Sequence, residues 1–151
     1  MSTVDARSDV AARLDALQAA LAAEHAAVYG YGVVGGRIGD DRENEAATAY
    51  AAHRSRRDAL ARTVRDLGGR PAVAAAGYAL PFPVPDAAAA IRLAAVLEER
   101  VAAVYSDLVR ATEGPLRLEA AGALREAAVR AVRWRGSGVA FPGLAERADQ
   151  D

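Results

Sequence analysis

Three titratable side chains fall on the apolar faces of predicted helices, where a charge needs a partner. Glu24 lies on a stripe of apolar residues at helical spacing within residues 14–31. Glu98 lies on a similar stripe within residues 91–108, and His53 lies on the inward face of the helical segment between them. An unpaired buried charge is too costly to keep, so each carboxylate must face a metal ion, a base or a hydrogen-bonding group.

Other chemistries have little support in the sequence. The chain has no cysteine and no lysine, which excludes thiolate nucleophiles, disulfides and a lysine-containing phosphate loop. It also has no GxSxG elbow for a catalytic serine. Residues 30–35 match the GxGxxG dinucleotide pattern, but they follow a helical pattern instead of a strand, so we interpret the match as chance. We therefore predict no catalytic residues and no organic cofactor, and we favour a non-catalytic role over an enzyme, with a diiron- or dimanganese-type oxidoreductase as the alternative.

Composition predicts an all-α protein with one domain over residues 1–151. Hydrophobic residues make up 52% of the chain and aromatic residues only 5%, with alanine and leucine dominant, which favours closely packed helices. The net charge of −1 gives no reason to expect nucleic acid or a membrane surface as a partner. We expect a cytoplasmic protein, because the chain has no cysteine and its first ten residues do not form a secretory signal.

Four segments have helical periodicity together with start and stop signals. Ser8 or Asp9 is the expected cap of the first helix, Asp40 with Glu43 has capping-box spacing, and Asp86 precedes the third helix. The predicted helices span about residues 5–34, 41–67, 87–112 and 115–135, followed by a tail over residues 136–151.

The connection between the second and third helices is long. Residues 69–85 hold four of the six prolines of the chain and show no helical rhythm. Neighbouring antiparallel helices are usually joined by about 2–8 residues, so a connection of this length predicts a crossover to the far end of an antiparallel bundle. Apolar side chains at Tyr78, Leu80, Phe82 and Val84 are expected to hold the crossover against the helices.

With this outline, the chain resembles the ferritin-like superfamily. More narrowly, it is similar to an actinobacterial family of ferritin-like proteins without an assigned function, a DUF4439-like domain. The resemblance covers residues 10–144 and rests on the motifs EHAAVYGYGVVGGR, AHRSRRDAL, YALPFPV and LEERVAAVYSDL. Dimetal sites in such bundles take one Glu from each of two helices and a Glu-x-x-His pair from each of the other two.

The resemblance implies a site for iron or manganese, but the ligand set is incomplete. Tyr50 stands where the second helix needs a glutamate, and Val129 stands where the fourth helix needs a histidine. A site with so few ligands serves two metal ions poorly and one ion only with added water. The metal-ligand candidates that remain are Glu24, His53, Glu98 and Glu126.

A metal-free network is the alternative that we favour. Arg57 lies one turn after His53 and Tyr50 one turn before it, so both can join Glu24, Glu98 and a tyrosine hydroxyl in a buried polar network. The sequence then predicts a non-catalytic structural or interaction protein, whose protein or small-molecule partner is unknown. The competing hypothesis is an iron- or manganese-binding oxidoreductase or metal-handling protein.

A homodimer is predicted from the third helix. Residues 87–112 are apolar over more of the helix circumference than one core face needs, and many of them are alanines. Small side chains permit close approach of two copies across a two-fold axis.

Overall fold

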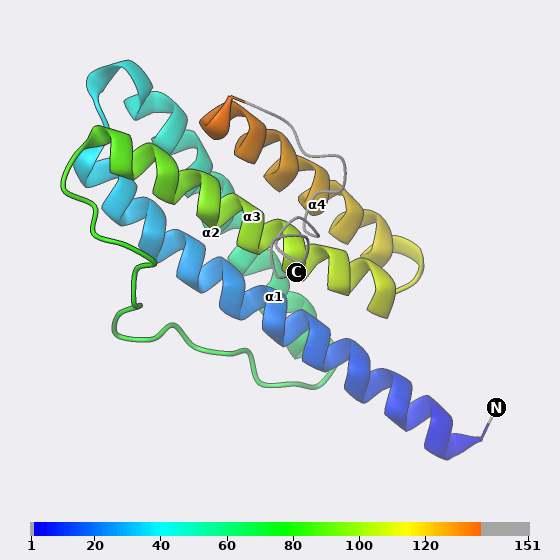
Figure 1. Cartoon of the computed structure of the whole chain (residues 1–151). Helices are drawn as coiled ribbons and strands as arrows, with labels where there is room; N and C mark the ends of the chain where they lie inside the picture. Colours follow the sequence, from blue (N-terminus) through cyan, green and yellow to red (C-terminus); the bar gives the residue numbers. More distant parts are fainter. Residues whose placement is uncertain (1, 137–151) are drawn as a thin grey trace, which may run out of the picture.

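The computed structural model describes residues 2–136, which form four long helices and one short helix (Figure 1). The described part of the chain contains no strand, so the all-α prediction is confirmed. Of the predicted tail, only Gly136 lies within the described residues. The elements are α1 (Thr3–Arg37), the 3₁₀ helix η1 (Asp40–Arg42), α2 (Glu43–Asp66), α3 (Ala87–Ala111) and α4 (Gly114–Arg135).

The four long helices form a bundle in which α1 packs against α2 and α3, and α3 packs against α4. Figure 1 shows that the connection after α2 runs back along the bundle, so that α3 begins near the end where α2 also begins. This is the predicted crossover. By contrast, α2 and α4 do not pack closely, and side chains bridge the seam between them.

Two of the predicted helix caps are wrong. The first helix begins earlier than expected, because Ser2 and Asp5 form a capping box that satisfies the amide groups of its first turn. Residues 40–42 form the separate 3₁₀ turn, and α2 has no side-chain cap where Asp40 and Glu43 were expected to provide one. Asp86 does cap α3, since its Oδ1 accepts a hydrogen bond from the Ala89 amide at 2.9 Å.

The crossover is fastened to α1 by polar and apolar contacts. The Gln18 side chain donates a hydrogen bond from Nε2 to the Arg70 carbonyl oxygen and accepts one at Oε1 from the Ala72 amide. The ring nitrogen Nε2 of His25 lies 3.0 Å from the Ala72 carbonyl oxygen. Farther along, Leu80, Phe82 and Val84 pack against the core as expected. His25 is thus engaged by the crossover and not by the interior.

The helix α3 is the centre of the core. Its buried residues face α1, α4 and the crossover, so its wide apolar circumference is used within one chain. The exposed large apolar side chains lie on other segments: Val4, Val10 and Tyr29 on α1, Val73 on the crossover, and Leu118, Val129 and Val132 on α4. The homodimer therefore stays a prediction, without the surface on α3 that motivated it. Within residues 2–136, no helix combines the length and the apolar character needed to cross a bilayer.

Close packing of α1 on α3 depends on Gly30. A Cβ atom built at Gly30 would lie 2.5 Å from Cδ1 and 3.1 Å from Cγ of Leu97, which is itself in the core. Gly32, half a turn away on the same helix, has no such neighbour within 4 Å. The two glycines therefore separate the effect of packing from the effect of helix propensity.

We expect Gly30→Ala and Gly32→Ala to differ in sign. Alanine at position 32 should stabilise the protein by up to about 1 kcal/mol, because it is the better helix former. At position 30 that gain is opposed by an overpacking cost of about 1–3 kcal/mol against Leu97. Urea denaturation of both variants is the measurement, and equal stabilisation by the two alanines would contradict the close contact.

Candidate functional site

The three titratable residues singled out by the sequence meet in the middle of the bundle. Glu24 comes from α1, His53 from α2 and Glu98 from α3, with exposed fractions of 0%, 1% and 0%. Two tyrosines, Tyr31 from α1 and Tyr105 from α3, complete the set. These five residues are called the interior network below.

His53 bridges the two carboxylates. Its Nδ1 lies 2.6 Å from Oε2 of Glu24, and its Nε2 lies 2.8 Å from Oε1 of Glu98. A neutral imidazole carries one N–H and can donate to only one of them, which would leave a lone pair facing a carboxylate oxygen on the other side. Both short contacts are satisfied when His53 is an imidazolium and donates from both nitrogens.

The charge environment agrees with that protonation state. Burial by itself lowers the pKa of His53, but hydrogen bonds with Glu24 and Glu98 and their negative charges outweigh it and raise the pKa to about 9. At neutral pH, His53 is therefore positively charged between two carboxylates.

The tyrosines connect α1 and α3 in a reciprocal way. Tyr31 of α1 donates to Oε1 of Glu98 at 2.6 Å, and Tyr105 of α3 donates to Oε1 of Glu24 at 2.7 Å. In each helix the tyrosine follows the glutamate by seven residues, or about two turns. Because the helices run in opposite directions, each tyrosine reaches the glutamate of the other helix.

Both tyrosines are held as neutral hydrogen-bond donors. Burial, and next the negative charge of Glu98, raise the pKa of Tyr31 far above that of an ordinary phenol. Burial and the charge of Glu24 do the same to the pKa of Tyr105. The Tyr31 hydroxyl oxygen also accepts a hydrogen bond from Nε1 of Trp134 on α4, at 3.0 Å. The Tyr31 ring stacks on the imidazole of His53.

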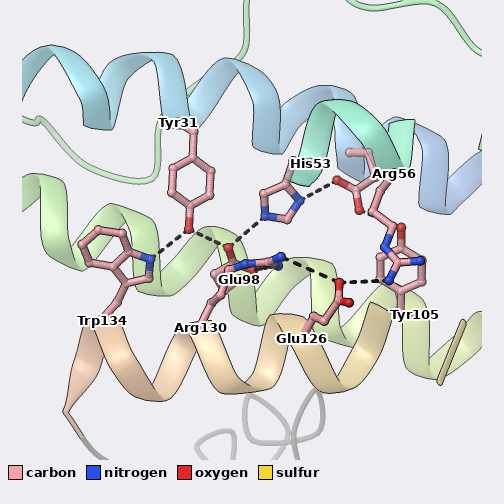
Figure 2. A network of polar contacts seen from close by, with 9 residues as sticks. Tyr31, His53, Arg56, Glu98, Tyr105, Glu126, Arg130 and Trp134 are labelled. Atoms are coloured by element: carbon pink, nitrogen blue, oxygen red, sulfur yellow. Dashed lines mark hydrogen bonds and ion pairs between the residues drawn. The ribbon is translucent and has the colours of Figure 1, made fainter. Parts of the chain in front are cut away.

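A row of ion pairs crosses the seam beside the interior network (Figure 2). Arg56 of α2 donates to Oε2 of Glu126 on α4 at 2.9 Å. Arg130, one turn farther along α4, lies 3.7 Å from the same Glu126 oxygen and 3.7 Å from Oε2 of Glu98. That Glu98 oxygen is buried and has no hydrogen-bond partner in the described part of the chain. Arg130 therefore provides charge compensation without a hydrogen bond.

Counting charges shows that the interior and the row of ion pairs balance. The carboxylates of Glu24, Glu98 and Glu126 carry three negative charges, and His53, Arg56 and Arg130 carry three positive charges when His53 is protonated. Loss of the His53 proton would leave one uncompensated negative charge in a buried place, which is unfavourable.

The structure brings together some of the predicted residues and not others. Glu126 stands apart from the interior network, on the exposed side of Arg130. Arg57 does not join, because its guanidinium pairs with the neighbouring Asp58. Tyr50 is half-buried at the α1–α2 surface, with the Arg54 guanidinium over its ring. Arg130 supplies the positive charge that was expected from Arg57. Tyr31 and Tyr105 supply the hydroxyl donors of the network, and Tyr50 does not take part.

The donor set does not fit a metal ion. The two nitrogens of His53 point in opposite directions and each already faces a carboxylate, so Glu24 and Glu98 lie on opposite edges of the ring. The one carboxylate oxygen without a proton donor, Oε2 of Glu98, faces the positive charge of Arg130, which repels a cation. Within residues 2–136, no three carboxylate or imidazole side chains are grouped so that they can hold a metal ion.

Comparison with known proteins identifies the family but not an activity. The sequence profile of a domain of unknown function, DUF4439, matches residues 16–146. The chain belongs to the DUF4439 family. No curated protein matches it. A solved structure with 39% sequence identity, a conserved hypothetical protein, rv2844, from Mycobacterium tuberculosis, is similar over 83% of this chain and 96% of that one, with a TM-score of 0.81. The DUF4439 chain therefore has a fold that an experimental structure shares.

The raised pKa of His53 predicts a pH dependence of stability. The folded pKa of about 9 lies above the ordinary value of 6.5, so the protonated ring stabilises the fold fully below pH 6.5. This contribution is lost as the pH rises through 9 and amounts to about 3 kcal/mol. Urea denaturation at a series of pH values between these limits measures it. Histidine NMR signals that show no group titrating above pH 8 would contradict the assignment.

Substitutions should distinguish Arg57, which the sequence predicted to join the network, from Arg130, which the structure places beside Glu98. Replacing Arg130 with glutamine leaves the Glu98 oxygen without its facing charge and should destabilise the protein by about 1–3 kcal/mol. Replacing Arg57 with glutamine removes only an exposed pair with Asp58, for which a loss within about 0.5 kcal/mol is expected. Thermal denaturation of the two variants compares them directly, and a larger loss for Arg57→Gln would overturn the assignment.

Proposed function

We propose that this DUF4439 protein is a ferritin-like bundle whose interior charge network takes the place of a metal centre, and that it serves as a non-catalytic structural or interaction protein. The observation that carries the proposal is the bridging of two carboxylates by both nitrogens of His53. His53, Tyr31 and Tyr105 donate hydrogen bonds to three of the four carboxylate oxygens of Glu24 and Glu98 that a metal ion would need. The ferritin-like assignment is supported by the long connection between α2 and α3 and by inward carboxylates on α1 and α3.

The network suits a structural role better than a catalytic one. General acid or base catalysis needs a group within hydrogen-bonding reach of a substrate and a pKa near the working pH. His53 is 1% exposed and both of its nitrogens are engaged, and the hydroxyl groups of both tyrosines donate to buried carboxylates. Each group is therefore occupied in holding one helix to another.

The second candidate is an iron or manganese protein that uses Glu24, His53 and Glu98. One observation favours it, because Oε2 of Glu98 is a buried carboxylate oxygen without a hydrogen-bond donor. Occupation by metal would require His53 to lose its proton and at least one bridging contact to break. The two candidates therefore differ in how stability responds to metal.

Metal analysis and chelation distinguish the two candidates. For protein produced in medium supplemented with iron and manganese, we expect far less than one metal ion per chain and no change in melting temperature on adding EDTA. A metal bound to the folded state alone would add RT ln(1 + [L]/Kd) to the free energy of unfolding and so raise the melting temperature, which EDTA would then lower. Near-stoichiometric iron or manganese, with a response to EDTA that His53→Gln abolishes, would overturn the metal-free proposal.

A further inference from the structure

An open cavity lies where the N-terminal end of α2 faces the C-terminal end of α4. Its volume is about 290 Å³, and it lies beside the interior network without being part of it. Because α2 and α4 do not pack closely, the cavity opens along the seam between them. It is lined by Asn44, Glu45, Thr48 and Ala49 from α2 and by Arg130, Arg133 and Trp134 from α4.

Two guanidinium groups in this cavity have no hydrogen-bond acceptor among residues 2–136. Arg130 has a side chain only 19% exposed, and its closest carboxylate oxygens lie 3.7 Å away, too far for a hydrogen bond. Arg133 makes no side-chain hydrogen bond or ion pair within the described residues, and only its backbone carbonyl is used, by Arg42. Guanidinium groups are suited to planar, two-oxygen acceptors such as carboxylates.

The acids near the cavity are already paired. Both oxygens of Glu45 accept hydrogen bonds from Arg42, at 2.8 and 2.9 Å. Glu126 is paired with Arg56, and Glu98 belongs to the balanced interior described above. After these pairs are counted over residues 2–136, Arg133 is the one cation lining the cavity that has no acid paired with it, which matches a ligand with a single negative charge better than a doubly charged phosphate.

We propose that this cavity binds a small organic monocarboxylate. The carboxylate would accept hydrogen bonds from Arg130 and Arg133, and the Asn44 amide group lines the same cavity as a further donor. The apolar part of the ligand would lie against Ala49 and the edge of Trp134 that lines the cavity, because the Arg42 guanidinium lies over the ring, 4.2 Å from its centroid. The cavity is larger than a bare inorganic anion needs, so a ligand with a small hydrocarbon group uses it more fully. This site is independent of the metal question.

Trp134 makes the proposal directly measurable, because it is the single tryptophan of the chain and it lines the cavity. Titration with cyclohexanecarboxylate at constant ionic strength should change tryptophan fluorescence in a saturable way. A ligand of this size should have a dissociation constant on the order of 1 mM. Acetate should bind more weakly because it has less apolar surface, and phosphate more weakly still because of its charge.

Variants on one helix provide the control. Arg133→Gln should raise the dissociation constant by about tenfold, because one charge-assisted hydrogen bond to the carboxylate is lost. Arg125→Gln removes a charge from the exposed face of α4 outside the cavity and should leave the dissociation constant unchanged. Arg130→Gln should abolish saturation, with circular dichroism used to show that this variant is folded.

Three outcomes would overturn the proposal. The first is a fluorescence response to the carboxylates that equals the response to chloride at matched ionic strength. The second is equal weakening by Arg133→Gln and Arg125→Gln, which would show a general charge effect. The third is tighter binding of phosphate than of cyclohexanecarboxylate, which would assign the cavity to inorganic oxyanions instead.

Discussion

Burial of two carboxylates at the centre of a small bundle is the constraint on which the rest of the structure depends. Glu24 and Glu98 are fully buried, and an ion in such a place is stable only when its charge and hydrogen-bonding capacity are met nearby. The bundle meets this need with a contribution from every long helix: Tyr31 from α1, His53 from α2, Tyr105 from α3 and Arg130 from α4. The position of each helix is therefore tied to the same pair of negative charges.

The reciprocal arrangement of α1 and α3 gives the bundle an approximate internal symmetry. Each helix supplies a glutamate and, two turns later, a tyrosine, and His53 lies between the two glutamates. A slide of one helix by a single turn, about 5.4 Å, would break both tyrosine contacts at once. Replacing a buried ionic group with apolar side chains is often neutral or stabilising, so net stability is a weak reason for such a network. We therefore interpret it as a device that specifies how α1 and α3 are aligned.

Much of the fold and part of the site could be predicted because they depend on local patterns. Helical periodicity placed Glu24, His53 and Glu98 on inward faces, and prolines without helical rhythm predicted the crossover. The seven-residue spacing of glutamate and tyrosine is also visible in the sequence, but its meaning requires knowing that α1 and α3 are antiparallel neighbours. The choice of arginine could not be predicted in this way. At 100° per residue, positions 56 and 57 lie about 60° to one side and about 40° to the other side of His53. Only the packed structure shows that the first side faces α4, where Arg56 meets Glu126.

Arg130 gives the interior of this bundle a feature that differs from the interior of a dimetal bundle. In a dimetal bundle the fourth helix brings an acid and a histidine to the ions, whereas here its inward-facing polar group beside Glu98 is a cation. A fixed positive charge next to a carboxylate does part of what a bound metal would do, without supplying a coordination position or a redox centre. The same side chain has no hydrogen-bond acceptor in the described part of the chain and borders the cavity at the open seam. Thus the cation that stands beside Glu98 in the interior also contributes a positive charge to the lining of the neighbouring seam.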